Sequence, residues 1–184
     1  MKIYLASKSP RRCALLKQIN INYEVINIDI DESVKKNEMP LDYVHRLARE
    51  KARVGKEFSK NNLPVLAADT AVVLDNFVLG KAECKEDAID ILNKLSGCTH
   101  DVLSAVTIIN KKETTKINIS KVTFKALSKD EISCYCDTNE PIGKAGGYAI
   151  QGKGAALIKK LEGSYSGVMG LPLEETYQLL SKCD

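Results

Sequence analysis

Two strand-like runs near the middle of the chain, residues 100–110 and 113–126, narrow the choice of fold. Only Lys111 and Lys112 separate these runs, so the sequence predicts that they pair as an antiparallel hairpin. Strand-like and helix-like segments alternate on both sides, which is typical of helices packed against a sheet. Because the hairpin adds antiparallel strands to that sheet, the sequence predicts an α/β (mixed α+β) fold in which helices flank a mixed sheet.

The other segments supply the remaining strands and helices. The length of 184 residues favours a single domain over residues 1–184. Composition and apolar patterning predict strands at residues 1–6, 23–30, 63–74, 77–79, 156–161 and 165–169. Caps and helical spacing predict a helix that begins at Pro10 and further helices at residues 41–59, 85–96, 128–135 and 172–181.

The composition is that of a soluble globular protein and argues against two other classes. A net charge of +3 is too small for a protein that wraps nucleic acid. Aromatic residues make up 5% of the chain and Trp is absent, which argues against stacking on single strands. No segment approaches the roughly 18 consecutive apolar residues of a membrane span. We therefore expect neither a nucleic-acid partner nor a membrane partner.

The cysteines indicate a reducing compartment. The six residues are scattered, with no C-x-x-C pair, and Cys134 and Cys136 are too close in sequence for a zinc knuckle. The N-terminal apolar run is short and ends at basic residues, so it is not a signal peptide. We expect reduced thiols and a cytoplasmic location.

Positive charge lies where a helix does not favour it. Ser9 is a good N-cap and Pro10 a good first helical residue, so Arg11 and Arg12 fall in the first turn. Acidic residues are normally preferred there, beside the positive end of the helix dipole. A solvated basic turn is one interpretation. The other is a phosphate site, because free N–H groups at a helix start already bind anions.

Lys51 breaks the pattern of the predicted helix at residues 41–59. It lies near the centre of the apolar face, which holds Leu41, Val44, Leu47, Ala48, Ala52 and Phe58. A lysine in that position either extends its stem to solvent or meets a buried or bound anion.

Asp69 interrupts the most strand-like segment of the chain. A carboxylate inside a central strand costs several kcal/mol unless it is paired or binds metal. The alternative is a structural carboxylate bonded to backbone at a strand end. Strict alternation points Asp69 and Thr70 to opposite faces, so we expect the strand to end or distort there if both contact one ligand.

Other polar residues add to this set. Asp31 and Glu32 form either a solvated acidic turn or, with Asp69, a site for a hard divalent cation. Lys81 follows Gly80 at the end of a short strand. Residues 147–153 match G-x-x-x-x-G-K, but Gly154 stands where a P-loop needs Ser or Thr, which argues against an ordinary nucleotide kinase. The amide of Gln151 remains suited to a base edge.

The sequence resembles the Maf family of nucleoside triphosphate pyrophosphatases almost from end to end. The combination of Arg11, Thr70 and Gln151 resembles the branch that acts on dTTP and UTP. The segments that carry the resemblance are residues 5–12, 47–52, 68–70, 79–81, 95–97, 144–152 and 167–172.

The resemblance implies an elongated mixed sheet with two lobes around a central cleft, like inosine triphosphate pyrophosphatases. It implies hydrolysis of dTTP and UTP, or of modified pyrimidine nucleotides, to the monophosphate and diphosphate, as house-cleaning of nucleotide pools. A homodimer is also implied. The roles it implies are general base for Asp69; metal ligands Glu32 and Asp69 for Mg²⁺ or Mn²⁺; phosphate contacts for Ser7, Ser9, Arg11, Arg12, Lys51 and Lys81; and base selection by Arg11, Thr70 and Gln151.

Two departures from the family pattern leave other functions open. Ala82 replaces a usual Pro, and Gly143 replaces a usual Asp, which removes a carboxylate near the site. If the loss of that carboxylate abolishes chemistry, the protein is a non-catalytic nucleotide-binding regulator of cell division and septum formation. A further alternative is a pyrophosphatase of the inosine type, which prefers purine triphosphates.

Overall fold

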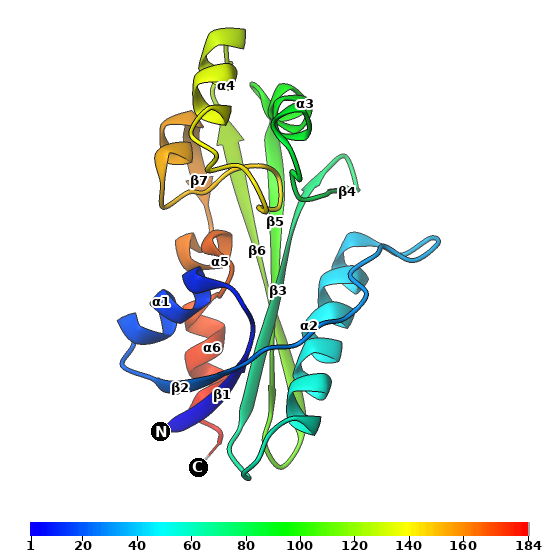
Figure 1. Ribbon diagram of the computed structural model, residues 1–184, viewed down its shortest axis with the longest axis vertical. Coiled ribbons are helices and arrows are strands. Elements are labelled where there is room, and N and C mark those ends of the chain that lie inside the picture. The colour runs from blue at the N-terminus through cyan, green and yellow to red at the C-terminus, as the bar shows by residue number, and fades with distance from the viewer. Residues whose placement is uncertain (184) are drawn as a thin grey trace.

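The computed structural model describes residues 1–183, and within them the chain forms one mixed sheet of seven strands (Figure 1). The order is β2-β1-β3-β5-β6-β7, and β4 pairs with β3. Strands β2, β1 and β3 are parallel to one another, and the other pairings are antiparallel. The strands are β1 (Lys2–Ala6), β2 (Asn22–Ile26), β3 (Val65–Leu74), β4 (Phe77–Leu79), β5 (Thr99–Ile109), β6 (Glu113–Phe124) and β7 (Ile158–Glu162).

Helices cover both faces of this sheet. In the lower half of Figure 1, α2 lies on one face and α1 and α6 lie on the other. Helices α3 and α4 cover the upper ends of the long strands, so β3, β5 and β6 run through both lobes. The helices are α1 (Pro10–Gln18), α2 (Pro40–Glu57), α3 (Lys85–Leu95), α4 (Lys129–Cys136), α5 (Tyr165–Met169) and α6 (Leu173–Leu180), with a 3₁₀ turn, η1, at Lys153–Leu157. None of the helices within residues 1–183 combines the length and apolar character that a bilayer crossing requires.

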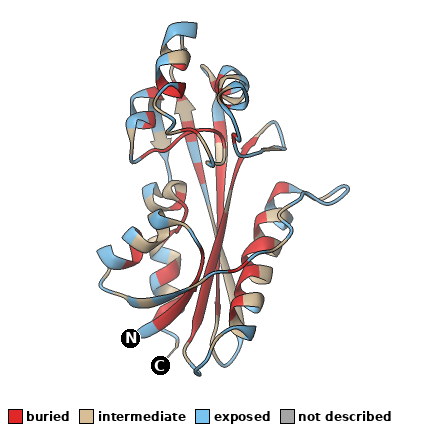
Figure 2. Ribbon diagram, viewed as in Figure 1, coloured by how far each residue is buried: buried red, intermediate tan, exposed pale blue. Residues whose placement is uncertain are grey.

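Alternation along β3 divides the core between the two faces. Leu66 and Ala68 pack with residues of α1 and α6, whereas Ala71 and Val73 pack with Val44 of α2. A separate cluster fills the upper lobe around Phe124. Figure 2 shows β3 buried over most of its length, as expected for a strand covered on both faces.

The predicted mixed fold and hairpin are confirmed. Strands β5 and β6 pair continuously from Thr99 opposite Thr123 to Ile109 opposite Glu113. The turn at Asp75 and Asn76 also forms, with positive φ at both residues.

Three predicted strands need correction. Residues 165–169 form helix α5, because the Ser164 hydroxyl accepts the Gly167 N–H and Gly170 ends the helix in the left-handed region. Residues 156–157 belong to η1, so β7 begins at Ile158. The strand predicted at residues 23–30 ends at Ile26, where its pairing with β1 ends.

One part of β3 lacks a neighbour on one side. Strand β1 pairs with β3 only as far as Leu66, and β4 begins to pair at Val72. Within residues 1–183, β3 therefore has an unpaired edge at residues 67–71, on the side opposite β5. Side chains from both faces of the strand can reach the space beside this edge.

Candidate active site

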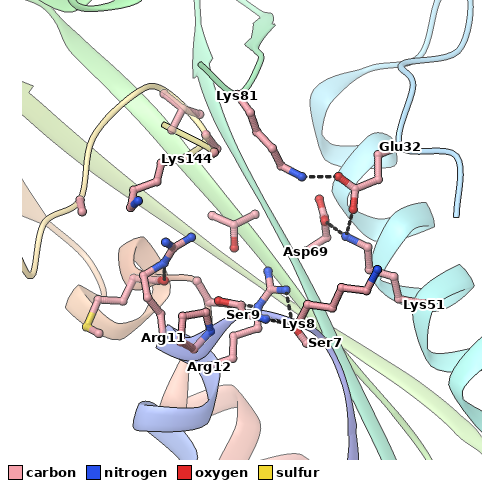
Figure 3. A pocket seen from close by; sticks show the side chains of 18 of the residues that line it. Ser7, Lys8, Ser9, Arg11, Arg12, Glu32, Lys51, Asp69, Lys81 and Lys144 are labelled. Atoms are coloured by element: carbon pink, nitrogen blue, oxygen red, sulfur yellow. Dashed lines mark hydrogen bonds and ion pairs between the residues drawn. The ribbon is translucent and has the colours of Figure 1, made fainter. Parts of the chain in front are cut away.

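A cavity of about 390 Å³ lies beside the unpaired edge of β3. That volume is within the usual range for small-molecule sites. Figure 3 shows basic side chains converging on it from separate elements. The cavity gathers every residue that the sequence singled out for a site role, namely Ser7, Ser9, Arg11, Arg12, Glu32, Lys51, Asp69, Thr70, Lys81 and Gln151.

The turn from β1 into α1 supplies one wall of the cavity. Ser9 is the N-cap residue, but its side chain makes no cap hydrogen bond; its N–H instead donates to Ser7 Oγ at 3.2 Å. Arg12 donates from Nη1 to Ser7 Oγ at 3.1 Å and from Nε to the Gly170 carbonyl at 2.7 Å. The Ser7 hydroxyl and the Arg12 guanidinium therefore hold each other at the cavity wall.

The two arginines remain close together despite their like charge. Arg11 Nε donates to the Met169 carbonyl at 3.3 Å. Burial lowers the pKa of both Arg11 and Arg12, and in Arg12 the nearby Asp69 carboxylate opposes that effect. Guanidinium groups stay protonated under such shifts, so this wall carries concentrated positive charge. An anion in the cavity would relieve the repulsion.

Lys51 meets an anion, as one of its two interpretations predicts. Its Nζ lies 2.6 Å from Asp69 Oδ1 and 2.7 Å from Glu32 Oε1. Lys81 donates to the second oxygen of Glu32, so lysines and carboxylates alternate across the cavity (Figure 3). Lys51 and Asp69 are 7% and 6% exposed, which makes this pair a buried one.

The lysines keep Glu32 ionised. Burial raises the pKa of Glu32, but the hydrogen bonds from Lys51 and Lys81 outweigh that effect and bring it to about 2. The Tyr43 hydroxyl donates to the Glu32 carbonyl at 2.9 Å, which fixes the backbone of the same residue. Glu32 is thus a charged, positioned carboxylate and not a solvated turn.

Asp69 and Thr70 both line the cavity although they point to opposite faces of β3. The expectation that the strand would end or distort is wrong, because the register with β5 continues through Asp69 and Thr70 to Val73. Both side chains reach the cavity because β3 lacks a neighbour at this edge. Asp69 faces α2, where it meets Lys51, and Thr70 faces α5, where its Oγ1 lies 2.7 Å from Ser104 Oγ. The cavity therefore has an acidic and lysine-rich side and a side with neutral hydrogen-bonding groups.

Comparison with known proteins agrees with this geometry. Residues 2–183 match the family of Maf-like proteins. The chain belongs to the Maf family.

Curated members of the Maf family are similar over nearly the whole chain. A dTTP/UTP pyrophosphatase of Alkalilimnicola ehrlichii is 48% identical and the match covers 98% of this chain and 92% of that protein. The protein of the same name from Pseudoalteromonas translucida is 49% identical over 97% of this chain and 95% of its own length. The one from Escherichia coli (strain K12) is 46% identical over 97% and 91%.

Solved structures outside the Maf sequences are similar at lower identity. A dITP/XTP pyrophosphatase from Mycobacterium abscessus matches with a TM-score of 0.48 and 19% identity, covering 67% of this chain and 74% of its own. The Ham1 protein of Staphylococcus aureus matches with a TM-score of 0.46 and 18% identity, covering 67% and 71%.

The Maf cavity holds a pair of carboxylates that fits a divalent cation. Glu32 and Asp69 each place one oxygen against the same ammonium group, Lys51 Nζ, so both already face a single cation. Within residues 1–183, no cluster of three or more His, Cys, Asp or Glu side chains forms a complete metal site. Two carboxylates completed by phosphate oxygens and water are an arrangement that Mg²⁺ commonly adopts.

Some cavity residues were not assigned a role from sequence. Lys8 and Lys144 both line the cavity and add positive charge to it. Burial lowers the pKa of Lys144, and Arg11 lowers it further. Neither lysine breaks a helical or strand pattern, so no local signal distinguished them. Gly143 also lines the cavity, and nothing lies within 4 Å of the place where its Cβ would be.

Proposed function

We propose that this protein hydrolyses dTTP and UTP, or modified forms of these nucleotides, to the nucleoside monophosphate and diphosphate. The observation that carries the proposal is the convergence of Arg11, Arg12, Lys51 and Lys81 with two carboxylates in one cavity. Phosphoryl transfer depends mainly on positioning and on neutralising charge, which is what such a set provides. The names of the similar Maf proteins support the choice of substrates.

Asp69 acts as the general base in this mechanism. A water molecule attacks the α-phosphorus and gives a proton to the Asp69 carboxylate. The bond from the α-phosphorus to the bridging oxygen breaks, and diphosphate leaves with the electron pair. Resemblance to the Maf family is what selects this α–β bond, and the buried position of Asp69 beside Lys51 supports its role.

The cations hold the triphosphate while this reaction takes place. Arg11, Arg12, Lys51 and Lys81 neutralise the phosphate oxygens, and the Ser7 and Ser9 hydroxyls hydrogen-bond them. Glu32 and Asp69 would hold Mg²⁺ or Mn²⁺. When bound, such an ion polarises the phosphate oxygens and offsets their negative charge. Because Lys51 pairs with both carboxylates, it must turn toward phosphate before they can hold the ion.

The base lies on the other side of the β3 edge. Thr70 faces that side, and Arg11 and Gln151 line the same cavity. A site that pairs the polar edge of a pyrimidine rejects analogues with a different donor and acceptor pattern. These three residues therefore select uracil and thymine.

A substrate panel tests the proposal. Purified protein with Mn²⁺ is given dTTP, UTP, CTP and inosine triphosphate, and diphosphate release is measured. Release from dTTP and UTP that Asp69→Asn abolishes is the expected result. Release mainly from inosine triphosphate would support the purine alternative. Tight binding of dTTP or UTP without turnover would support the non-catalytic regulator of cell division.

We further propose a single working domain over residues 1–184, found in the cytoplasm as a homodimer, with no nucleic-acid or membrane partner. The free thiols of Cys13, Cys84, Cys98, Cys134 and Cys136 support a reducing compartment. The net charge of +3 supports local anion binding over binding of nucleic acid. The dimer rests on family resemblance alone, and sedimentation equilibrium tests it.

A further inference from the structure

Ser104 lies beside the cavity without reaching it. It sits on β5 directly opposite Thr70 in the strand register, and its side chain is fully buried. Its Oγ lies 2.7 Å from Thr70 Oγ1 and 2.7 Å from the carbonyl oxygen of Gly167 in α5. Ser104 therefore connects a cavity-lining hydroxyl to the backbone of a helix.

Counting protons gives this chain of hydrogen bonds a direction. A serine hydroxyl has a single proton, and a carbonyl oxygen can only accept. The Ser104 proton is thus used in the bond to Gly167, so the proton in the bond between the two hydroxyls belongs to Thr70. Thr70 donates to Ser104, Ser104 donates to Gly167, and Thr70 offers the cavity only its lone pairs.

The acceptor at the end of this chain is held in place. The Ser164 hydroxyl accepts the Gly167 N–H at 3.0 Å, which caps α5. The Gly167 carbonyl also accepts the Gly170 N–H at 3.0 Å. Because α5 fixes that carbonyl, the Ser104 hydroxyl cannot reverse its direction without leaving a buried acceptor short of a donor.

An acceptor-only Thr70 matches one atom on the bases of the proposed substrates. The polar edge of uracil or thymine carries one donor, N3–H, between two carbonyl acceptors. Cytosine has an unprotonated N3 at the same position, whose lone pair would face the lone pairs of Thr70. We propose that Ser104 is a positioning residue that makes Thr70 accept from N3–H, and so favours UTP and dTTP over CTP. This inference rests on the proposed function.

Ser104→Ala tests the inference. The change removes the Oγ that receives the Thr70 proton and adds no bulk, so the Thr70 hydroxyl becomes free to turn its proton toward the base. We expect the UTP to CTP ratio of kcat/KM to fall by about tenfold, as for loss of one well-placed hydrogen bond. Inhibition by tripolyphosphate, which has no base, is expected to stay within about twofold of wild type.

Ser120→Ala is the matched control. Ser120 is also buried, and its Oγ accepts the Ser164 N–H at 2.9 Å at the start of the same helix, α5. It does not contact Thr70, so we expect its removal to leave the UTP to CTP ratio unchanged. An equal fall in both variants would assign the effect to general loosening of α5 and overturn the proposal.

An unchanged ratio in folded Ser104→Ala would also overturn the proposal. If that variant does not fold, Ser104→Cys replaces it, because a thiol is a weaker hydrogen-bonding partner, and the same criterion applies with a smaller fall. Failure of both variants to fold would make Ser104 a stability residue and reject the positioning role. Failure of the proposed function is a separate outcome: wild-type protein would release no diphosphate, while calorimetric binding of UTP and CTP would still report the preference.

Discussion

Lys51 occupies the point where the two carboxylates of the cavity meet. It compensates Asp69, which is 6% exposed, and shares Glu32 with Lys81. Removal of one partner from a buried ion pair leaves an uncompensated charge and usually costs about 3–5 kcal/mol. Lys51 thus contributes to the stability of the empty protein as well as to the proposed binding of phosphate.

We expect Lys51→Met to lower the free energy of unfolding by about 3 kcal/mol, because Asp69 then lacks its nearest cation. Urea unfolding measures the change. Combining it with Asp69→Asn should recover most of the loss, since the uncompensated charge is gone. Lys56→Met, on the same helix but outside the cavity, serves as control. A Lys51→Met protein as stable as wild type would show that the pair is not energetically significant.

Residues that violate their local pattern were recognisable from sequence. Lys51 on an apolar helix face and Asp69 inside an apolar strand each predicted a partner, and the structure pairs them with each other. Lys144 and Ser104 fit their surroundings in sequence, and only the packing of distant segments gives them importance. The contact of Thr70 and Asp69 with one cavity was also unpredictable, because it depends on where β1 stops pairing with β3.

The loop between α4 and η1 forms the upper wall of the cavity and is closed at its base by one carboxylate. Glu140 Oε2 accepts the Lys153 N–H at 3.0 Å, and Oε1 accepts the Gly154 N–H at 2.9 Å. Glu140 Oε1 also accepts the Tyr135 hydroxyl, which in turn accepts the Ala149 N–H. The G-x-x-x-x-G-K segment thus binds a carboxylate of its own chain where a P-loop would bind phosphate.

Glu140→Gln is expected to loosen this loop, because an amide cannot accept at both of its polar atoms. Faster amide hydrogen exchange at residues 151–154 and a several-fold higher KM for UTP are the expected results. Glu131→Gln is the control, since Glu131 likewise accepts a backbone N–H, from Ser128, at the start of α4. Equal exchange in wild type and Glu140→Gln would show that other contacts hold the loop.

Strand β5 carries a buried histidine into the core of the upper lobe. His100 is 2% exposed, and its Nε2 lies 2.8 Å from the hydroxyl of Tyr148, a residue that also lines the cavity. Burial lowers the pKa of His100 to about 4, from the 6.5 expected in the unfolded chain. The folded state therefore resists protonation more than the unfolded state does.

Stability is consequently expected to be highest above pH 6.5 and to fall as the pH drops toward 4, because the unfolded chain binds the proton first. The full loss corresponds to about 3 kcal/mol. Urea unfolding at pH 6.5 and 5.0 measures most of this slope, and His100→Phe should remove it. An equal slope in the variant would place the titration at another group.

The long strands β3, β5 and β6 join two lobes whose facing ends build a single cavity (Figure 1). Lower elements supply the turn into α1 and Lys51 of α2, and upper elements supply Lys81 and the loop that carries Gln151. These upper segments are bonded to each other, since the Gly143 N–H donates to the Ala82 carbonyl at 2.8 Å. A nucleotide in the cavity would therefore touch both lobes and both faces of β3.

The sequence predicted this architecture as far as its local signals allowed. The hairpin, the capped helices and the mixed sheet follow from patterns within single segments. Helix α5 was predicted as a strand, because Tyr165 to Met169 has strand-like composition and only its end caps and packing make it helical. The error affects the site directly, since Gly167 of that helix anchors the hydrogen bonds behind Thr70.

A crystal structure with a non-hydrolysable UTP analogue and Mn²⁺ tests the central claim most directly. The account predicts the α-phosphate beside Asp69 on the α2 face of β3, and the uracil beside Thr70 on the α5 face. The triphosphate should contact Arg11, Arg12, Lys51 and Lys81. A nucleotide with base and phosphates on the same face of β3, or bound outside this cavity, would contradict it.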